Sequence, residues 1–328
     1  MSLSLSSSLR SFPLCLFLLT GTQAVARADM DPVVAAERAL RTGHADAASG
    51  QLQGVLAAHP NSGSAHLLLC RVFLSEGLFS EAVAECQAAL ANGLDHDSAA
   101  QDWAGRAEGR QAEHAGMFQG LKLAIQVHAA FEAAVRLDPH NEEACADLGE
   151  YYTEAPAIVG GGTGRALGLA DRVERPLPIV AHRIRAMVAE RGKEYATAER
   201  EFRLAVDSSH APGAMVDLAA YYDRRHDHDK AVAVAREALR ADPRCDSSVV
   251  GAAGILEGQH ETAQAEAAMR SYLDHDAQSD AEPTFRVHTL LANNLARSGD
   301  KAGARAEYTQ ALSLASRYAP AQKGLGEL

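Results

Sequence analysis

A small residue recurs along the chain at intervals of about 34 residues, and this recurrence restricts the fold more than any other feature. Small or apolar residues follow most of these anchors four, seven and eight positions downstream, a spacing that places them on one face of a helix. The anchors are Ala48, Ala82, Val127, Ala166, Ala198, Ala231, Ala263 and Ala304. A second apolar helix precedes the anchored one in several copies. Because a single helical hairpin cannot bury its own apolar face, the pattern predicts stacked hairpins that share a core.

The composition agrees with an all-helical fold. Hydrophobic residues make up 47% of the 328 residues, aromatic residues only 5%, and alanine is abundant throughout. Alanine has the highest helix propensity, and its small side chain lets helices approach closely. We therefore expect an all-α chain with enough apolar surface for a packed core.

The repeat resembles the tetratricopeptide repeat, whose pattern is W-x2-L-G-x2-Y, then A-x3-F, then P, over about 34 residues. Leu148, Gly149 and Tyr152 match the first helix of that pattern, and Ala198 with Phe202 matches the second. The resemblance covers residues 29–328. It implies a right-handed superhelical solenoid of about eight hairpins, with a concave groove that binds other proteins.

Two insertions interrupt the period, at residues 95–119 and 155–164, and insertions in repeat arrays are expected to form loops. The second contains Pro156, Gly160, Gly161 and Gly162. Glycine clusters can present backbone N–H groups to phosphate, but the G-x4-G-K-[S/T] spacing of a P-loop is absent from Gly160 to Gly164. We expect a structural loop, with a partner contact as the first alternative and phosphate binding as the second.

Residues 1–28 have the features of a secretory signal peptide. Arg10 precedes a short apolar run at residues 12–19, and small-x-small patterns predict cleavage after Ala26 or Ala28. An uncleaved anchor is the alternative, although the run is short for a membrane span. No later segment reaches spanning length, so we expect an exported protein, periplasmic or secreted, with no stable membrane span after cleavage.

Four cysteines lie beyond the predicted signal peptide: Cys70, Cys86, Cys145 and Cys245. They form no Cys-x-x-Cys motif, so zinc and thioredoxin-like chemistry are not indicated. We expect all four to act as small buried residues. Cys70 and Cys86 fall on the two helices of one hairpin and are the pair best placed to form a disulfide.

Charge and motifs argue against several classes of function. The net charge of −12 disfavours nucleic acid as a partner. No Gly-x-Ser-x-Gly or Ser-x-x-Lys framework indicates a hydrolase, so we predict no catalytic site and no cofactor. His226 and His228 could supply metal ligands, but they lie at an expected helix–helix turn without a second cluster to complete the site. A helical enzyme or metal-binding protein that uses this turn or the Gly160–Gly164 loop is the alternative function.

The predicted function is a non-catalytic scaffold that binds a peptide or protein of unknown identity. In the tetratricopeptide fold the first helix of each hairpin lines the concave face, which places charges of both signs there. The predicted groove residues are Arg71, Glu150, Glu154, Arg183, Glu190, Asp223, Arg224, Asn293 and Arg297. The Lys/Asn/Arg carboxylate clamp of the family's chaperone-binding members is not evident in this sequence, since only Asn293 and Arg297 fall in comparable places.

Overall fold

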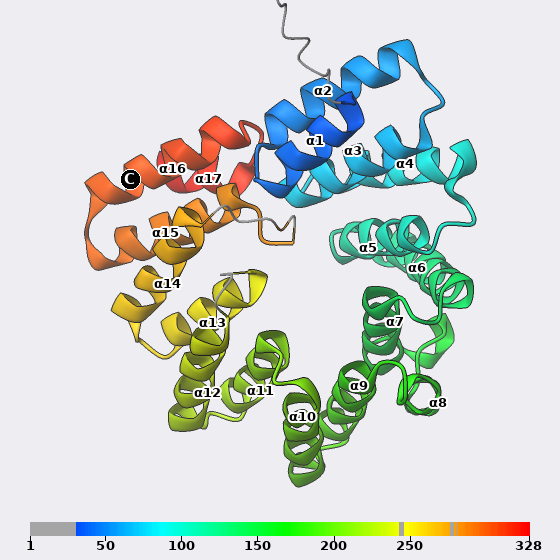
Figure 1. Cartoon of the computed structure of the whole chain (residues 1–328), viewed down its shortest axis with the longest axis vertical. Helices are drawn as coiled ribbons and strands as arrows, with labels where there is room; N and C mark the ends of the chain where they lie inside the picture. The colour runs from blue at the N-terminus through cyan, green and yellow to red at the C-terminus, as the bar shows by residue number, and fades with distance from the viewer. Residues whose placement is uncertain (1–30, 243–245, 276–278, 280) are drawn as a thin grey trace, which may run out of the picture. The chain divides into compact units, whose positions relative to one another are not determined.

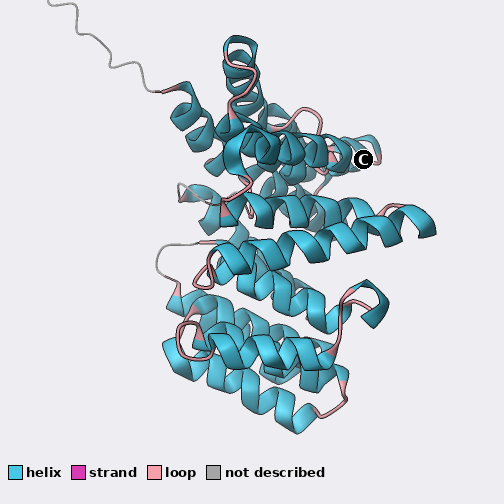
Figure 2. Cartoon of the chain, turned by 90° about the vertical axis from the view of Figure 1, so that its right-hand side faces the viewer, coloured by secondary structure: helices cyan, strands magenta, loops and turns pink. Residues whose placement is uncertain are grey.

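The computed structural model describes residues 31–242, 246–275, 279 and 281–328, which form helices joined by turns and loops, without a strand (Figure 2). The predicted all-α class is therefore confirmed. The predicted signal peptide with Ala26 and Ala28, and also Cys245, lie outside the described residues. The helices are α1 (Pro32–Arg41), α2 (Ala45–Ala58), α3 (Gly63–Glu76), α4 (Phe79–Ala89), α5 (Ser98–Glu113), α6 (Met117–Leu137), α7 (Glu142–Glu154), α8 (Thr163–Val173), α9 (Pro178–Arg191), α10 (Tyr195–Ser209), α11 (Pro212–Arg224), α12 (His228–Ala241), α13 (Ser247–Gly258), α14 (Thr262–Asp274), α15 (Thr284–Ser298), α16 (Lys301–Leu314) and α17 (Ala319–Gly326).

Consecutive helices pair as hairpins, from α1 with α2 to α15 with α16, and each hairpin packs against the next along the chain. Within residues 31–328, Figure 1 shows the odd-numbered helices from α5 to α15 on the inner side and their even-numbered partners outside. The short helix α17 packs on the last hairpin, against α15 and α16. This arrangement buries one apolar face of each helix between neighbouring helices.

The same tight turn joins the two helices of six hairpins. One residue of the turn is left-handed: Gly43, Gly77, Lys193, His226, His260 or Gly299. Its backbone N–H bonds a carbonyl three residues upstream, as from His226 to Asp223 (2.9 Å), and the next N–H reaches five residues upstream, from Asp227 to Tyr222 (2.9 Å). Glycine suits the left-handed conformation because it has no Cβ, whereas a histidine there carries a modest strain. His226 is thus a turn residue of the repeat.

Burial places the anchors in a common register. Seven of the eight expected anchors are buried on the second helix of a hairpin. In six of these seven, as at Ala48 in α2 and Ala304 in α16, the anchor is the fourth residue of that helix. The prediction for the seventh hairpin is wrong: Ala263 is exposed, and the buried residue is Ala265, again the fourth of its helix. With Ala265 as the anchor, the buried residues Met269 and Tyr272 follow four and seven positions later.

The two insertions have different structures. Residues 95–119 are mostly helical: they include α5, and they end in the first residues of α6. The anchor Val127 is the eleventh residue of α6 instead of the fourth, so this helix begins seven residues, or two turns, earlier than its counterparts. The second insertion is a loop, with a 3₁₀ turn at Ala157–Val159 before α8.

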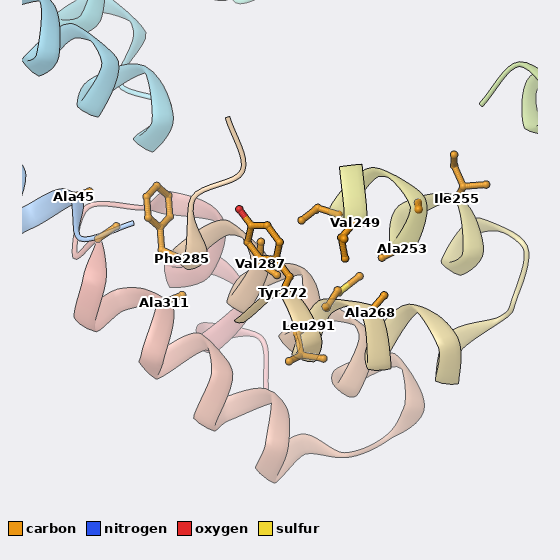
Figure 3. Close-up of a cluster of buried hydrophobic side chains, with 14 of the residues drawn as sticks. Ala45, Val249, Ala253, Ile255, Ala268, Tyr272, Phe285, Val287, Leu291 and Ala311 are labelled. Atoms are coloured by element: carbon orange, nitrogen blue, oxygen red, sulfur yellow. The ribbon is translucent and has the colours of Figure 1, made fainter. Parts of the chain in front are cut away.

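The first and last hairpins of the array contact each other. Figure 3 shows Ala45 of α2 beside Phe285 of α15, within one buried hydrophobic cluster that takes side chains from α1 to α5 and from α9 to α17. The Thr284 hydroxyl donates to the Thr42 carbonyl (3.1 Å), and the Ser316 N–H donates to Asp46 (2.9 Å). Arg317 forms an ion pair with Glu81 at 2.9 Å. We call these contacts the seam.

The second hairpin contains a disulfide between Cys70 of α3 and Cys86 of α4, with a Cα–Cα distance of 5.2 Å. The prediction that these two cysteines are only buried filler residues is therefore wrong; facing helices of one hairpin bring them within bonding distance. Cys145 is a buried free thiol, and burial raises its pKa to about 11. Among the described helices, none is long and apolar enough to cross a bilayer.

Candidate functional site

Five of the nine predicted groove residues lie together on the inner side of the array. Glu150 and Glu154 of α7, Arg183 and Glu190 of α9, and Arg224 of α11 line a cavity of about 440 Å³. These helices are the inner members of three successive hairpins (Figure 1). Because successive hairpins stack, residues far apart in the chain line one cavity, at equivalent places on their inner helices.

Arg183 is the central cation of this cavity. It donates to Glu150 of the preceding hairpin (3.0 Å) and pairs with Asp217 of the following one (3.2 Å). The Asp217 side chain keeps 37% of its surface exposed but lies against the groove wall, and desolvation there raises its pKa while Arg183 opposes the shift. Arg183 thus connects three hairpins through charge.

Two more ion pairs complete the cavity. Arg224 donates to both carboxylate oxygens of Glu190 through its Nε and Nη2 atoms, at 2.9 and 2.8 Å, and this two-point geometry fixes both side chains. Arg191 pairs with Glu154 at 2.8 Å. Each of the three arginines in the cavity already has a carboxylate partner.

A second cavity of about 390 Å³ continues the site toward α5 and shares Glu150 and Glu154 with the first. Arg106 and Arg110 both line it, and Arg106 contacts Asp147 at 2.5 Å, Asp102 at 3.0 Å and Glu143 at 3.2 Å. Burial raises the pKa of Asp102 to about 7, even with this arginine nearby. We call the residues lining the two cavities, from α5 to α11, the charged groove.

Trp103, the only tryptophan, lies beside the Arg106 cluster. The guanidiniums of Arg106 and Arg71 lie 4.6 and 5.1 Å from the centre of its ring. Cations at this distance from an indole face are attracted to its electron density. Arg71 thus contacts Trp103, which lies next to the charged groove. It is not among the residues that line the two cavities.

The other three predicted groove residues pair elsewhere. Asp223 accepts a hydrogen bond from Gln259, and Asn293 accepts one from the Tyr308 hydroxyl. Arg297 pairs with Glu257 and donates to Asn294 at 2.9 Å. The structure does not bring Asn293 and Arg297 into the charged groove.

Sequence reasoning missed Arg106, Asp147 and Asp217, although a signal for two of them was present. Asp147 and Asp217 each directly precede the leucine of the first-helix pattern, in Leu148-Gly149-x-x-Tyr152 and Leu218-Ala219-x-x-Tyr222. A residue next to that buried leucine turns toward the groove. Arg183 stands in the same position before the buried Ile184.

The glycine-rich loop is explained by close packing. A Cβ on Gly161 would lie 1.8 Å from the Ala155 carbonyl oxygen, and one on Gly160 would meet the ring of His128. The Tyr151 hydroxyl lies 2.7 Å from the carbonyl oxygens of both Ala124 and Val159 and shares its one proton between them, which holds the loop against α6. Pro156 and Gly162 complete the loop: the Gly161 N–H bonds the Pro156 carbonyl, and the Gly162 N–H bonds the Tyr152 carbonyl (2.7 Å).

The histidine turn offers no metal geometry. The His226 and His228 rings are 6.4 Å apart, and His228 bonds Gln259. Among the described residues, no group of three or more His, Cys, Asp or Glu side chains is arranged to hold a metal ion. Nothing in this part of the chain favours the alternative function.

Comparison with known proteins identifies the repeat. Residues 33–99 match the family model described as tetratricopeptide repeat. Yeast Tom70 superposes with a TM-score of 0.52 at 14% identity, over 86% of this chain and 59% of Tom70, so this chain spans a little over half of that protein. This likeness shows a shared fold.

Two bacterial structures are also similar. A thermophilic TPR protein of Thermus thermophilus covers 69% of this chain and 97% of its own, at 19% identity and a TM-score of 0.45. A tetratricopeptide repeat protein of Parabacteroides merdae covers 81% of this chain and 98% of its own, at 19% identity and 0.41. No curated protein sequence matches this chain. Proteins of this repeat family generally mediate protein–protein interactions and are typically non-catalytic. The repeat matched at residues 33–99 and the helical hairpins that continue it give the chain a tetratricopeptide repeat fold.

Proposed function

We propose that this protein is a non-catalytic scaffold that binds a peptide or protein partner in the charged groove. The observation that supports this most is the pair of adjoining cavities, which run along the inner helices from α5 to α11 and share Glu150 and Glu154. An open groove of this kind, lined by residues from several hairpins, suits an extended segment better than a small molecule.

The charges of the groove make it selective for partners with a particular arrangement of charge. Arg183, Arg191 and Arg224 already bind carboxylates, so a partner gains little from a single charge. A partner with both signs at matching positions can exchange these ion pairs for its own. Complementary charge of this type contributes more to specificity and association rate than to affinity.

We test the groove by reversing one ion pair without breaking it. In Glu190→Arg with Arg224→Glu the bidentate pair can re-form with opposite polarity, so the melting temperature stays close to that of the unchanged protein. Affinity capture from the cell envelope fraction, followed by mass spectrometry, is expected to show loss of the partner.

The matched control is Glu199→Arg with Arg203→Glu on the outer helix α10, where the pair has similar exposure. This variant is expected to retain the partner. Equal retention by both variants would exclude the groove as the binding site.

The scaffold is also proposed to be exported, with residues 1–28 as a cleaved signal peptide. The Cys70–Cys86 disulfide supports this location because disulfides persist mainly in oxidising compartments. Fractionation of cells that express the full chain or a form lacking residues 2–28 tests it. Recovery of both forms in the same fraction would contradict export by this segment.

A further inference from the structure

The two extra turns of α6 extend this helix beyond the other outer helices and expose large apolar side chains. Met117 is 85% exposed and Phe118 89%, and Leu121 and Ile125 continue along the same side at 44% and 53%. Ala129, also exposed, follows at the next four-residue step. Spacings of four place these side chains in one stripe along the helix.

This stripe is separate from the core contact of α6. Leu123, Val127 and Phe131 are buried against the neighbouring helices. The helix is therefore apolar on two faces, although only one of them is covered within the chain. A helix that is apolar all round is normally buried on all sides.

The second insertion lies beside the same surface. The Tyr151 hydroxyl bonds Ala124 of α6 and Val159 of the loop, and Ile158 next to Val159 is 82% exposed. Both interruptions of the repeat thus contribute apolar side chains to one region. We call Met117, Phe118, Leu121, Ile125, Ala129 and Ile158 the apolar patch.

The segment that carries most of the apolar patch has far fewer acidic residues than the rest of the chain. Residues 114–131 contain no carboxylate and one lysine, Lys122, in a protein with 43 acidic residues and a net charge of −12. Two copies of so acidic a chain repel each other over most of their surfaces. The patch is a region where they can meet without opposing carboxylates.

We propose that the apolar patch binds the same patch of a second copy of this chain, with the two α6 helices antiparallel about a two-fold axis. Such an axis near residue 123 sets Met117 of each copy against Ala129 of the other, and Leu121 against Ile125. The stripe runs from bulky residues at its start to a small one at its end, so antiparallel pairing matches large side chains with small ones. A two-fold contact of one surface with itself is the commonest form of protein assembly.

A membrane surface is the less favoured occupant. Helices that lie on membranes usually combine an apolar face with many lysines or arginines, and here there is one lysine. Methionine and aromatic residues with few charges are typical of the centre of protein interfaces.

Sedimentation velocity of the purified protein from about 1 to about 200 µM tests the proposal, because a contact of a few helical turns gives a concentration-dependent dimer. Phe118→Glu with Ile125→Glu is expected to weaken the dimer by about 100-fold, since it places acids at the centre of the interface. Both residues are exposed, so an unchanged circular dichroism melt shows that folding is intact. Leu204→Glu, a partly exposed leucine on α10, is the matched control and keeps the dimer.

Cross-linking tests the antiparallel geometry. Met117→Cys mixed with Ala129→Cys is expected to give a disulfide-linked dimer under mild oxidation. Neither variant alone does so, because equivalent residues lie about 18 Å apart along the paired helices. A monomer at every concentration, a dimer that survives Phe118→Glu with Ile125→Glu, or a monomer that binds phosphatidylcholine vesicles through Phe118 would each overturn the proposal.

Discussion

Glu76 and Asp102 are buried carboxylates that each leave an oxygen without a hydrogen-bond partner among the described residues, at a cost to stability. Glu76 at the end of α3 is 3% exposed, and its Oε1 atom has no hydrogen-bond partner among the described residues. Desolvation by burial raises its pKa to about 7; Asp46 and Glu81 add to the rise, and Arg317 opposes it. Asp102 has a similar pKa and also one unpartnered oxygen within the described part of the chain. Both groups favour the protonated form in the folded chain.

Stability should therefore fall as the pH rises through neutrality. In the unfolded chain Glu76 releases its proton near its ordinary pKa of 4.5, whereas the folded protein holds it until about pH 7. Its contribution is fully present below the unfolded value and is lost as the pH rises through the folded one. Glu76→Gln, which cannot ionise, is expected to raise the free energy of unfolding at pH 8 by up to about 3 kcal/mol relative to the wild type. Urea unfolding at pH 5 and pH 8 measures this, and an equal difference at both values would contradict it.

At the scale of helices, the sequence predicts the regular hairpins correctly but not the places where one hairpin departs from the repeat. The small anchors identify the second helix of each hairpin because only a small side chain fits where two helices cross closely. The pattern failed at Ala263, where another small residue, Ala265, lies two positions away and periodicity alone cannot choose between them. It also gave no sign that residues 95–119 would be helical, since extra turns keep the same local propensities as the helix they extend.

For the charged groove too, the sequence predicts which residues lie on the inner face but not how they pair. Register alone placed Glu150, Arg183 and Arg224 on the inner face, because every first helix turns the same side inward. Register could not show which charges pair across hairpins: Arg183 reaches Asp217 of the next hairpin only because the hairpins stack. Pairing depends on the superhelical twist, which no local pattern contains.

In the glycine-rich loop, the backbone packs so closely that a Cβ atom on Gly161 does not fit. Gly161→Ala would place a methyl group 1.8 Å from the Ala155 carbonyl oxygen, so the loop must shift, and we expect a loss of about 2 kcal/mol in the free energy of unfolding. Gly164→Ala, in the first turn of α8 with no atom within 4 Å, should be neutral or stabilise by about 0.5 kcal/mol. Chemical denaturation of both variants measures the difference. Equal stabilities would mean that the loop tolerates a Cβ.

The disulfide stabilises one hairpin of the array. Cys70 and Cys86 are 16 residues apart, and a bridge across such a loop stabilises a fold by about 3 kcal/mol. Reduction, or Cys70→Ala with Cys86→Ala, is expected to lower the melting temperature, and the reductant should then have no further effect on the double variant. Calorimetry with and without reductant measures this. A melting temperature that does not respond to reduction would contradict it.

At the scale of the whole array, the seam changes how stability is distributed. In an open solenoid each hairpin contacts only its neighbours, and the terminal ones fray first. Here α16 contacts α2, and Phe285 packs in the same cluster as Ala45 (Figure 3). At this junction the structure places the cation of Arg317 among the carboxylates of Asp46, Glu76 and Glu81. Its guanidinium also lies 5.5 Å from the centre of the Phe73 ring.

Arg317→Glu should therefore separate the ends of the array without unfolding its middle. The change adds a fourth carboxylate to the junction and removes the ion pair with Glu81. We expect faster hydrogen exchange in α1, α2 and α16, unchanged exchange in α9 to α11, and a larger radius of gyration by small-angle X-ray scattering. Arg317→Glu combined with Glu81→Arg restores one pair of opposite charges and should reverse much of both effects. Arg240→Glu, at an exposed arginine of the outer helix α12, is the control for the change in charge. If Arg317→Glu left both the exchange rates and the radius of gyration unchanged, the seam would contribute nothing to holding the first and last hairpins together.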